Sequence, residues 1–283
     1  MYPLTLLTLG VLGPSLASAA DCTREFLQAS ADSLVAAQTA GDPSLLKPVA
    51  ESFVYQENYR AATFKSGILA TALKIDHSRH SLDTTQCATY TELISAKGSK
   101  PYVIGTQMHF KDGAVSKVDT LITSTGDWLF NATGTLNWAS KEAWDPIPEA
   151  KRDSRAVIQA AADAYCDIFS NKSVVVPWGR PCARLEGGSY TGNGSPSDRC
   201  DVGIPSGVAL TDRRYVIDET VGAVDVFLSF SGIPDSHEFR VEGGKLRYVH
   251  TMTVMTARGN GNGNGNGKGK GRRVRGAMRP PRH

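Results

Sequence analysis

The chain has 283 residues, which is enough for two domains or one large domain, and 41% of them are hydrophobic. Its net charge of +3 comes from the end of the chain, because eight of the 31 Lys and Arg residues follow Met255 and no acidic residue does. The rest of the chain carries 23 basic against 28 acidic side chains. This balance argues against a globular domain that binds nucleic acid.

The first 19 residues are typical of a secretory signal peptide. A short apolar run from Pro3 to Leu12 is followed by Ala17-Ser18-Ala19, an A-x-A cleavage pattern. No later stretch is long and apolar enough to span a bilayer. We therefore predict a secreted, extracellular protein that has no membrane partner.

Three glycosylation sequons agree with export. They are Asn131-Ala132-Thr133, Asn171-Lys172-Ser173 and Asn193-Gly194-Ser195. Three such acceptors behind a signal peptide predict a glycoprotein.

The five cysteines predict two disulfides and one free thiol in an oxidising compartment. Cys182 and Cys200 flank a loop rich in Gly, Ser and Asp and are the first choice of pair. Closing a loop of that size contributes roughly 3 kcal/mol. Cys22 with Cys87 is the second choice, which leaves Cys166 buried in a helix. No C-x-x-C pair occurs, so no metal or redox site is predicted.

A nine-residue pattern occurs twice in the chain. Residues Arg24 to Asp32 and Arg155 to Asp163 share R-x-x-[L/I]-Q-A-x-A-D, with the apolar spacing of an amphipathic helix. Residues 79–85 and 214–220 share R-x-x-[L/I]-D-x-T. Because Asp83 and Asp218 recur with Arg79 and Arg214, we interpret these four residues as fold determinants rather than site residues.

The repeat continues to the last strands. Asp112-Gly113 and Gly243-Gly244 are hairpin turn signals between alternating segments. The offset between copies is 131 residues at the helices, 135 at the middle strands and 131 at the last strands. Each copy therefore predicts an α+β domain, with helices packed on one face of a curved antiparallel sheet.

The expected organisation has five parts. They are a signal peptide (1–19), a first α+β repeat (20–123), a linker (124–152), a second α+β repeat (153–257) and a disordered basic Gly/Asn-rich tail (258–283). The linker holds Trp128, Trp138 and Trp144, so we expect it to pack across the junction. The tail is either a solvated segment or a contact with polyanions, and Arg272-Arg273 is an alternative dibasic processing site.

Three segments carry a resemblance to known proteins: Tyr55-Gln56-Glu57-Asn58, Trp144-Asp145-Pro146-Ile147-Pro148 and, most specifically, residues 177–188 with the sequence PWGRPCARLEGG. Over residues 22–256 the chain resembles secreted fungal proteins that carry an uncharacterised domain. The order of helix and bent sheet also resembles the nuclear transport factor 2-like superfamily, which includes ketosteroid isomerase and SnoaL-type cyclases. This resemblance implies a cone between sheet and helices that holds a small hydrophobic molecule. In related enzymes a carboxylate or His in the cone moves a proton next to a carbonyl.

The first candidate catalytic residues are two acids. Glu57 lies beside Tyr55 and Asn58, and Glu186 lies near Arg184 in the corresponding part of the second copy. A carboxylate in a partly desolvated pocket can act as a general base, with Tyr, Asn or Arg binding the substrate. The alternative is that both acids cap or pair locally at structural turns.

His250 and its counterpart Asp119 are the other catalytic candidates. Strand parity places His250 on the apolar face of Tyr248, Met252 and Val254, where an inward imidazole can shuttle protons. The alternative is a histidine whose hydrogen bonds are satisfied in the core.

His80 and Trp178 are candidate substrate-binding residues. His80 shares the strand face of Leu82, which we expect to point to the core. Trp178 is either a pocket wall or a sugar-stacking platform, and the alternative is a buried plug beside the disulfide loop.

Two functional hypotheses remain. No serine-nucleophile elbow, phosphate-binding loop, HExxH or dinucleotide fingerprint occurs, so neither a cofactor nor a metal is predicted. The first hypothesis is a cofactor-free isomerase, cyclase or dehydratase acting on a small metabolite. The second is a non-catalytic secreted protein that binds a ligand or the cell wall. Converging ionisable groups in an enclosed cone favour the enzyme, and apolar cones in both copies favour the binder.

Overall fold

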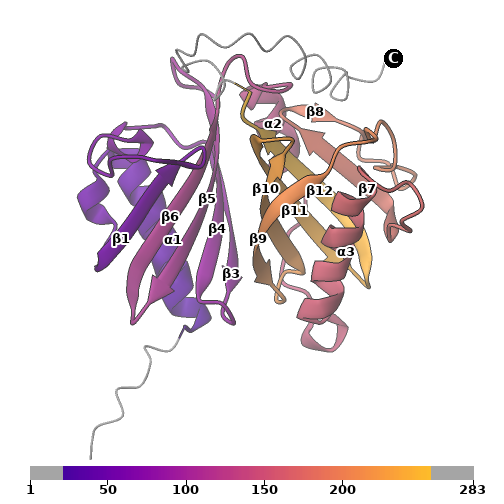
Figure 1. The fold of residues 1–283 in the computed structure, drawn as a ribbon, viewed down its shortest axis with the longest axis horizontal. Helices are drawn as coiled ribbons and strands as arrows, with labels where there is room; N and C mark the ends of the chain where they lie inside the picture. The colour runs from indigo at the N-terminus through magenta and orange to yellow at the C-terminus, as the bar shows by residue number, and fades with distance from the viewer. Residues whose placement is uncertain (1–21, 256–283) are drawn as a thin grey trace, which may run out of the picture.

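The computed structural model describes residues 22–255 and shows two copies of one helix-plus-sheet unit (Figure 1). The first unit contains helix α1 (Arg24–Ala40) and strands β1 (Val49–Glu57), β2 (Arg60–Ala61), β3 (His77–Asp83), β4 (Ala88–Ser95), β5 (Tyr102–Lys111) and β6 (Ala114–Thr123). The second contains α3 (Arg155–Asp167), β7 (Trp178–Glu186), β8 (Ser189–Tyr190), β9 (Leu210–Asp218), β10 (Ala223–Phe230), β11 (Ile233–Glu242) and β12 (Lys245–Thr253). Helix α2 (Ala132–Ala139) lies between them, and short 3-10 helices are η1 (Pro43–Leu45), η2 (Ile68–Ala70) and η3 (Glu149–Lys151).

The two sheets have the same topology. Their strand orders are β2-β1-β6-β5-β4-β3 and β8-β7-β12-β11-β10-β9. In each sheet the first long strand pairs in parallel with the last one, and the other neighbours are antiparallel. The predicted α+β class and the tandem arrangement are confirmed.

The helices form where the repeated pattern places them. Thr23 caps α1, because its hydroxyl accepts the Phe26 N–H at 3.2 Å. Gly41 ends that helix with a φ of 65°, a conformation that favours glycine. The helix buries Leu27 and Leu34 against its own sheet.

The two faces of each sheet are covered by different parts of the protein. In the second sheet, Val224 and Phe239 face α3 and belong to its apolar core. Phe227 and Met252 face the other way, into a core shared with Tyr90 of the first sheet. The two sheets therefore meet through the faces opposite α1 and α3, and α2 contributes Ala132 and Ala139 to their shared core.

Two reciprocal ion pairs join the units. Arg24 of α1 pairs with Asp218 of β9 at 2.7 Å, and Arg155 of α3 pairs with Asp83 of β3 at 2.7 Å. The same carboxylates accept backbone N–H groups across the interface, from Leu82 and residue 217, each at 2.9 Å. The recurring aspartates thus bind the helix arginines of the opposite unit, whereas the sequence grouped them with Arg79 and Arg214.

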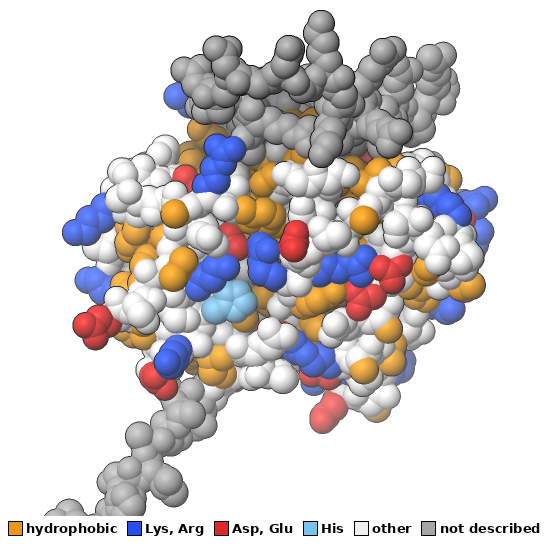
Figure 2. Space-filling model, in the orientation of Figure 1, with side chains coloured by type: hydrophobic (Ala, Val, Ile, Leu, Met, Phe, Trp, Pro, Cys, Tyr) orange, Lys and Arg blue, Asp and Glu red, His pale blue; other side chains and the backbone are white. Residues whose placement is uncertain are grey.

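Both predicted disulfides are present, Cys22–Cys87 and Cys182–Cys200, and Cys166 is a buried free thiol. Within residues 22–255, no helix has the length and apolar character needed to cross a membrane. Basic and acidic side chains are interspersed on the face drawn in Figure 2, without a broad patch of one sign. The predicted signal peptide and the basic tail lie outside the described residues.

Candidate functional site

The helix-covered interiors of the two units differ in polarity. In the first unit, Leu34, Tyr55 and Leu69 belong to an apolar core. In the second unit, five ionisable residues lie among the corresponding elements, and we call them the interior cluster: Tyr165, Arg184, Glu186, Asp235 and His237. When the two sheets are aligned at the turns of their last hairpins, Asp235 and His237 occupy the positions of Ile104 and Thr106 in the first unit.

Three elements bring the cluster together. Tyr165 comes from the buried face of α3. Arg184 and Glu186 alternate on β7, and Asp235 and His237 alternate on β11, so each pair lies on one face of its strand. Strand β12 lies between β7 and β11 in the sheet.

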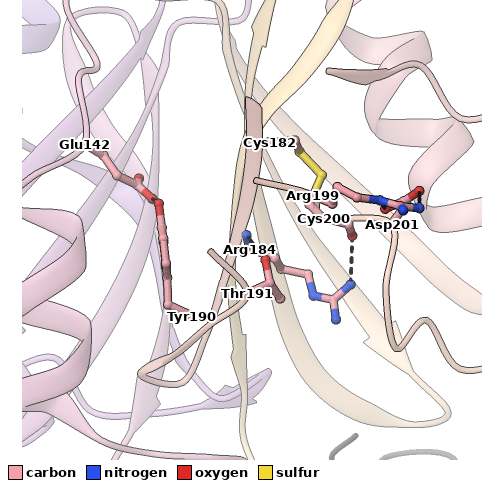
Figure 3. The surroundings of a disulfide bond; sticks show 8 residues. All are labelled: Glu142, Cys182, Arg184, Tyr190, Thr191, Arg199, Cys200 and Asp201. Carbon is pink, nitrogen blue, oxygen red and sulfur yellow. Dashed lines mark hydrogen bonds and ion pairs between the residues drawn. A yellow bond between two sulfur atoms is a disulfide. The ribbon is translucent and has the colours of Figure 1, made fainter. Parts of the chain in front are cut away.

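Arg184 is a buried cation with fixed partners. Its Nε lies 2.8 Å from Glu186 Oε1, and its Nη1 donates to the Cys200 carbonyl at 3.2 Å (Figure 3). The Cys182–Cys200 disulfide therefore holds the loop that fixes the guanidinium. Glu186 keeps 23% of its side chain exposed, so the cluster reaches the surface there.

Asp235 and His237 are almost completely buried. Asp235 Oδ1 accepts the Thr253 hydroxyl at 3.1 Å, and its Oδ2 lies 3.6 Å from His237 Nδ1. The imidazole centroid lies 5.5 Å from that of the Tyr165 ring. Among the described residues, Tyr165 Oη, Asp235 Oδ2 and His237 Nδ1 have no partner at hydrogen-bond geometry.

Burial sets the protonation of this cluster. It raises the pKa of Asp235 well above its ordinary value, which favours the protonated carboxyl. Burial, together with the positive charge of Arg184 and Arg213, lowers the pKa of His237 to about 3. Burial also raises the pKa of Tyr165. At neutral pH the cluster therefore offers a neutral imidazole and a phenol beside a guanidinium, with a carboxyl whose protonated form is favoured by burial.

These groups are costly to the fold. A buried polar group without a partner costs about 1–3 kcal/mol. The first unit builds the same sheet with Ile104 and Thr106 at the matching positions, so the fold does not require Asp235 or His237. Polar groups that the architecture does not need are typical of functional sites.

The predicted residues of the first copy have local roles. Glu57 accepts the Tyr55 hydroxyl at 2.7 Å and caps the Ile68 N–H of η2. Asn58 Oδ1 accepts the N–H of Ile122 at 2.8 Å. This geometry corresponds to local capping and pairing at a turn.

His250 and Asp119 lie between the sheets, away from the interior cluster. His250 contacts Glu92 of β4 at 2.9 Å and Glu142 of the linker at 2.6 Å. Asp119 pairs with Arg214 of the second unit at 3.2 Å. The apolar face of His250 does point inward, but inward here means towards the other sheet rather than towards the helix.

The acids around His250 already have a cation. Ligand atoms of Glu92, Glu238 and His250 lie within 4.8 Å of one another, which is a spacing that suits a metal ion. Arg79 Nη2 lies 2.5 Å from Glu238, 3.3 Å from Glu92 and 3.2 Å from His250. The guanidinium of Arg79 therefore neutralises these carboxylates, and its positive charge would repel a metal ion. We call these residues with Glu142 the Arg79 cluster.

The remaining candidates divide between the two units. His80 lies on the helix side of β3, with its ring 3.0 Å from Thr91 Oγ1. Trp178 packs on the Tyr165 ring at 5.7 Å and forms a wall of the interior cluster. The sequon residues Asn131, Asn171 and Asn193 are retained as candidate acceptors, and their glycosylation stays a prediction.

Sequence reasoning found Arg184, Glu186 and Trp178 but missed Tyr165, Asp235 and His237. A position-by-position comparison of the two copies reveals the missing three. It aligns them with Leu34, Ile104 and Thr106, where the first unit is apolar or uncharged.

The comparisons with known proteins concern the second unit. No curated protein matches the chain. Residues 151–253 match a family described as Domain of unknown function (DUF8021). This match spans every residue of the interior cluster.

Proposed function

We propose that the second unit is a cofactor-free enzyme that transfers a proton on a small carbonyl metabolite, within the interior cluster. The observation that carries the proposal is that the buried Asp235 and His237 occupy positions where the first unit has Ile104 and Thr106. Glu186, by contrast, has a counterpart in Glu57. A structural requirement of the fold would apply to both copies. The resemblance to the nuclear transport factor 2-like superfamily supports it, because enzymes of that group use the helix-side space.

His237 is the base in this proposal. Its imidazole is neutral at neutral pH and has an unpartnered nitrogen, so it can accept the proton that leaves a carbon next to the substrate carbonyl. The electron pair of the broken C–H bond moves into the enolate, and the oxygen gains negative charge. The imidazolium then returns the proton to another carbon or to a leaving group, which gives an isomerase or a dehydratase.

Arg184, Tyr165 and Asp235 stabilise the oxygen. The guanidinium supplies a full positive charge, and the phenol supplies a hydrogen-bond donor, and both side chains are buried. A carboxylic acid that burial keeps neutral can donate in the same way, as a protonated aspartate does in ketosteroid isomerase. No cofactor is needed for such a step.

We also propose that the enzyme acts outside the cell. The two disulfides fit an oxidising compartment, and the predicted signal peptide agrees with them. A disulfide that holds the loop over Arg184 stabilises the site outside the cell.

The test begins with the small molecules that co-purify with the secreted protein, identified by mass spectrometry. Each is incubated with the enzyme in deuterium oxide, and deuterium gained next to the carbonyl is measured. We expect exchange with the wild type and with His80→Gln, and none with His237→Gln. Exchange that persists in His237→Gln would show that His237 is not the base. Ligand binding without exchange or turnover in the wild type would instead favour a binding protein.

A further inference from the structure

A cleft of about 580 Å³ lies where the linker meets the second unit, on the side of β7 away from the interior cluster. We call it the junction cleft. Its lining includes Trp138, Lys141, Tyr190, Ser195, Arg247 and Tyr248. Neither the proposed chemistry at His237 nor the packing of the sheets accounts for it.

The acids of the junction cleft are already bound to internal donors. Glu142 accepts the Tyr190 hydroxyl and the Trp144 indole N–H, each at 3.0 Å, and pairs with His250 (Figure 3 shows Glu142 with Tyr190). Asp198 accepts three consecutive backbone N–H groups, those of residues 193–195, at 2.9–3.1 Å. The charge of Glu142 is balanced by His250, whereas Asp198 is held by neutral amides and keeps its negative charge.

The cations of the cleft have no such partner. Lys141 Nζ donates to Asn137 at 2.8 Å and lies 5.1 Å from the Trp138 ring centroid. Arg247 lies over the Tyr248 ring at 4.0 Å. Among the ion pairs of the described residues, none includes Lys141 or Arg247. The cleft therefore has two cations against the one unbalanced carboxylate of Asp198, and this positive excess favours an anionic ligand.

The rings of the cleft form rigid, flat surfaces. Trp138 and Tyr190 stack in parallel, with centroids 4.1 Å apart and planes 4° apart. Tyr248 is fixed by Trp144, with centroids 5.7 Å apart. Ser195 adds a hydroxyl group beside these rings. Aromatic walls with a few placed polar groups are typical of small-ligand sites, and sugar rings combine apolar faces with hydroxyls.

We infer that the junction cleft binds an acidic oligosaccharide, whose sugar rings lie against the aromatic residues and whose carboxylates pair with Lys141 and Arg247. This site is separate from the interior cluster, so it does not depend on the proposed catalysis. It gives the folded body a polyanion-binding site independent of the basic tail.

The test is calorimetric titration of the full-length protein with trigalacturonate at about 0.15 M salt, close to physiological ionic strength. We expect Lys141→Met and Arg247→Met each to raise Kd about tenfold, because each removes one charge pair. Lys245→Met is the matched control, since this exposed lysine of β12 lies outside the lining, and its Kd should equal that of the wild type. The methyl-esterified trimer should bind at least tenfold more weakly.

Three results would overturn the inference. They are no binding of trigalacturonate to the wild type, equal binding of the methyl ester, and unchanged binding by the Lys141→Met/Arg247→Met double variant. The last result would assign the binding to the tail, which every variant retains. His237→Gln should bind as the wild type does, so the failure of either proposal leaves the other standing.

Discussion

At the scale of single residues, Asp235 shows the cost of the interior cluster. Its folded pKa lies above the ordinary value of 3.8, so above pH 3.8 the folded state holds a proton that the unfolded state releases. Its contribution to stability therefore becomes less favourable as pH rises above that value. We expect Asp235→Asn to raise the free energy of unfolding at pH 7 by about 1–3 kcal/mol, while abolishing turnover.

Urea denaturation at pH 7 and pH 4 checks this expectation. The gain should shrink at pH 4, because the unfolded carboxyl, whose ordinary pKa is 3.8, is then partly protonated. A variant that is destabilised equally at both pH values would mean that Asp235 is structural.

At the scale of elements, the helices hold the two units together through buried carboxylates. Arg155 donates two hydrogen bonds to Asp83, at 2.8 and 2.7 Å, and Asp83 is completely buried. Removing the cation leaves an uncompensated charge. We expect Arg155→Met to lower the free energy of unfolding by about 3–5 kcal/mol in chemical denaturation.

The exposed Lys151→Met serves as a control and should change stability little. Arg155→Met/Asp83→Asn should recover part of the loss, because no charge is then left unpaired. An Arg155→Met variant as stable as the control would show that the reciprocal pairs do not hold the units together.

At the scale of the whole molecule, the Arg79 cluster makes the contact between the sheets depend on pH. Burial alone would lower the pKa of His250, but Glu142 and Glu92 raise it to about 10. A folded pKa above the unfolded value of 6.5 means that the stabilisation is complete below pH 6.5 and is lost as pH rises through 10. We expect the wild-type Tm to fall over this alkaline range.

Thermal unfolding between pH 6 and 10 measures the effect. In His250→Gln the Tm should start lower and change less with pH, because the titrating group is gone. Parallel curves for the two proteins would contradict a charged His250 at the interface.

Local patterns in the sequence predicted much of this architecture. The repeated helix motif, the glycine hairpin turns and the two cysteine pairs are short-range signals, and each appears in the structure. Strand parity also placed His250 on one face with Tyr248. Parity cannot say which layer covers that face, because the meeting of the two sheets depends on contacts such as Arg79 with Glu238, far apart in the chain.

Only part of the candidate site could be predicted from the sequence. Arg184 and Glu186 lie in a distinctive segment, whereas Asp235 and His237 lie in an ordinary alternating strand. Their importance comes from burial without partners, which depends on the packed structure. The motifs shared by both copies lie at the interface between the units, whereas Asp235 and His237 have no ionisable counterpart in the first copy.

The central claim is that catalysis belongs to the interior cluster and not to the Arg79 cluster. The most direct test compares kcat/KM of the wild type, His237→Gln and His250→Gln on the co-purified metabolite, below the temperature at which any variant unfolds. We predict a loss of about 10²- to 10⁴-fold for His237→Gln, as for removal of a general base, and a value close to wild type for His250→Gln. A large loss for His250→Gln with full activity for His237→Gln would contradict this claim.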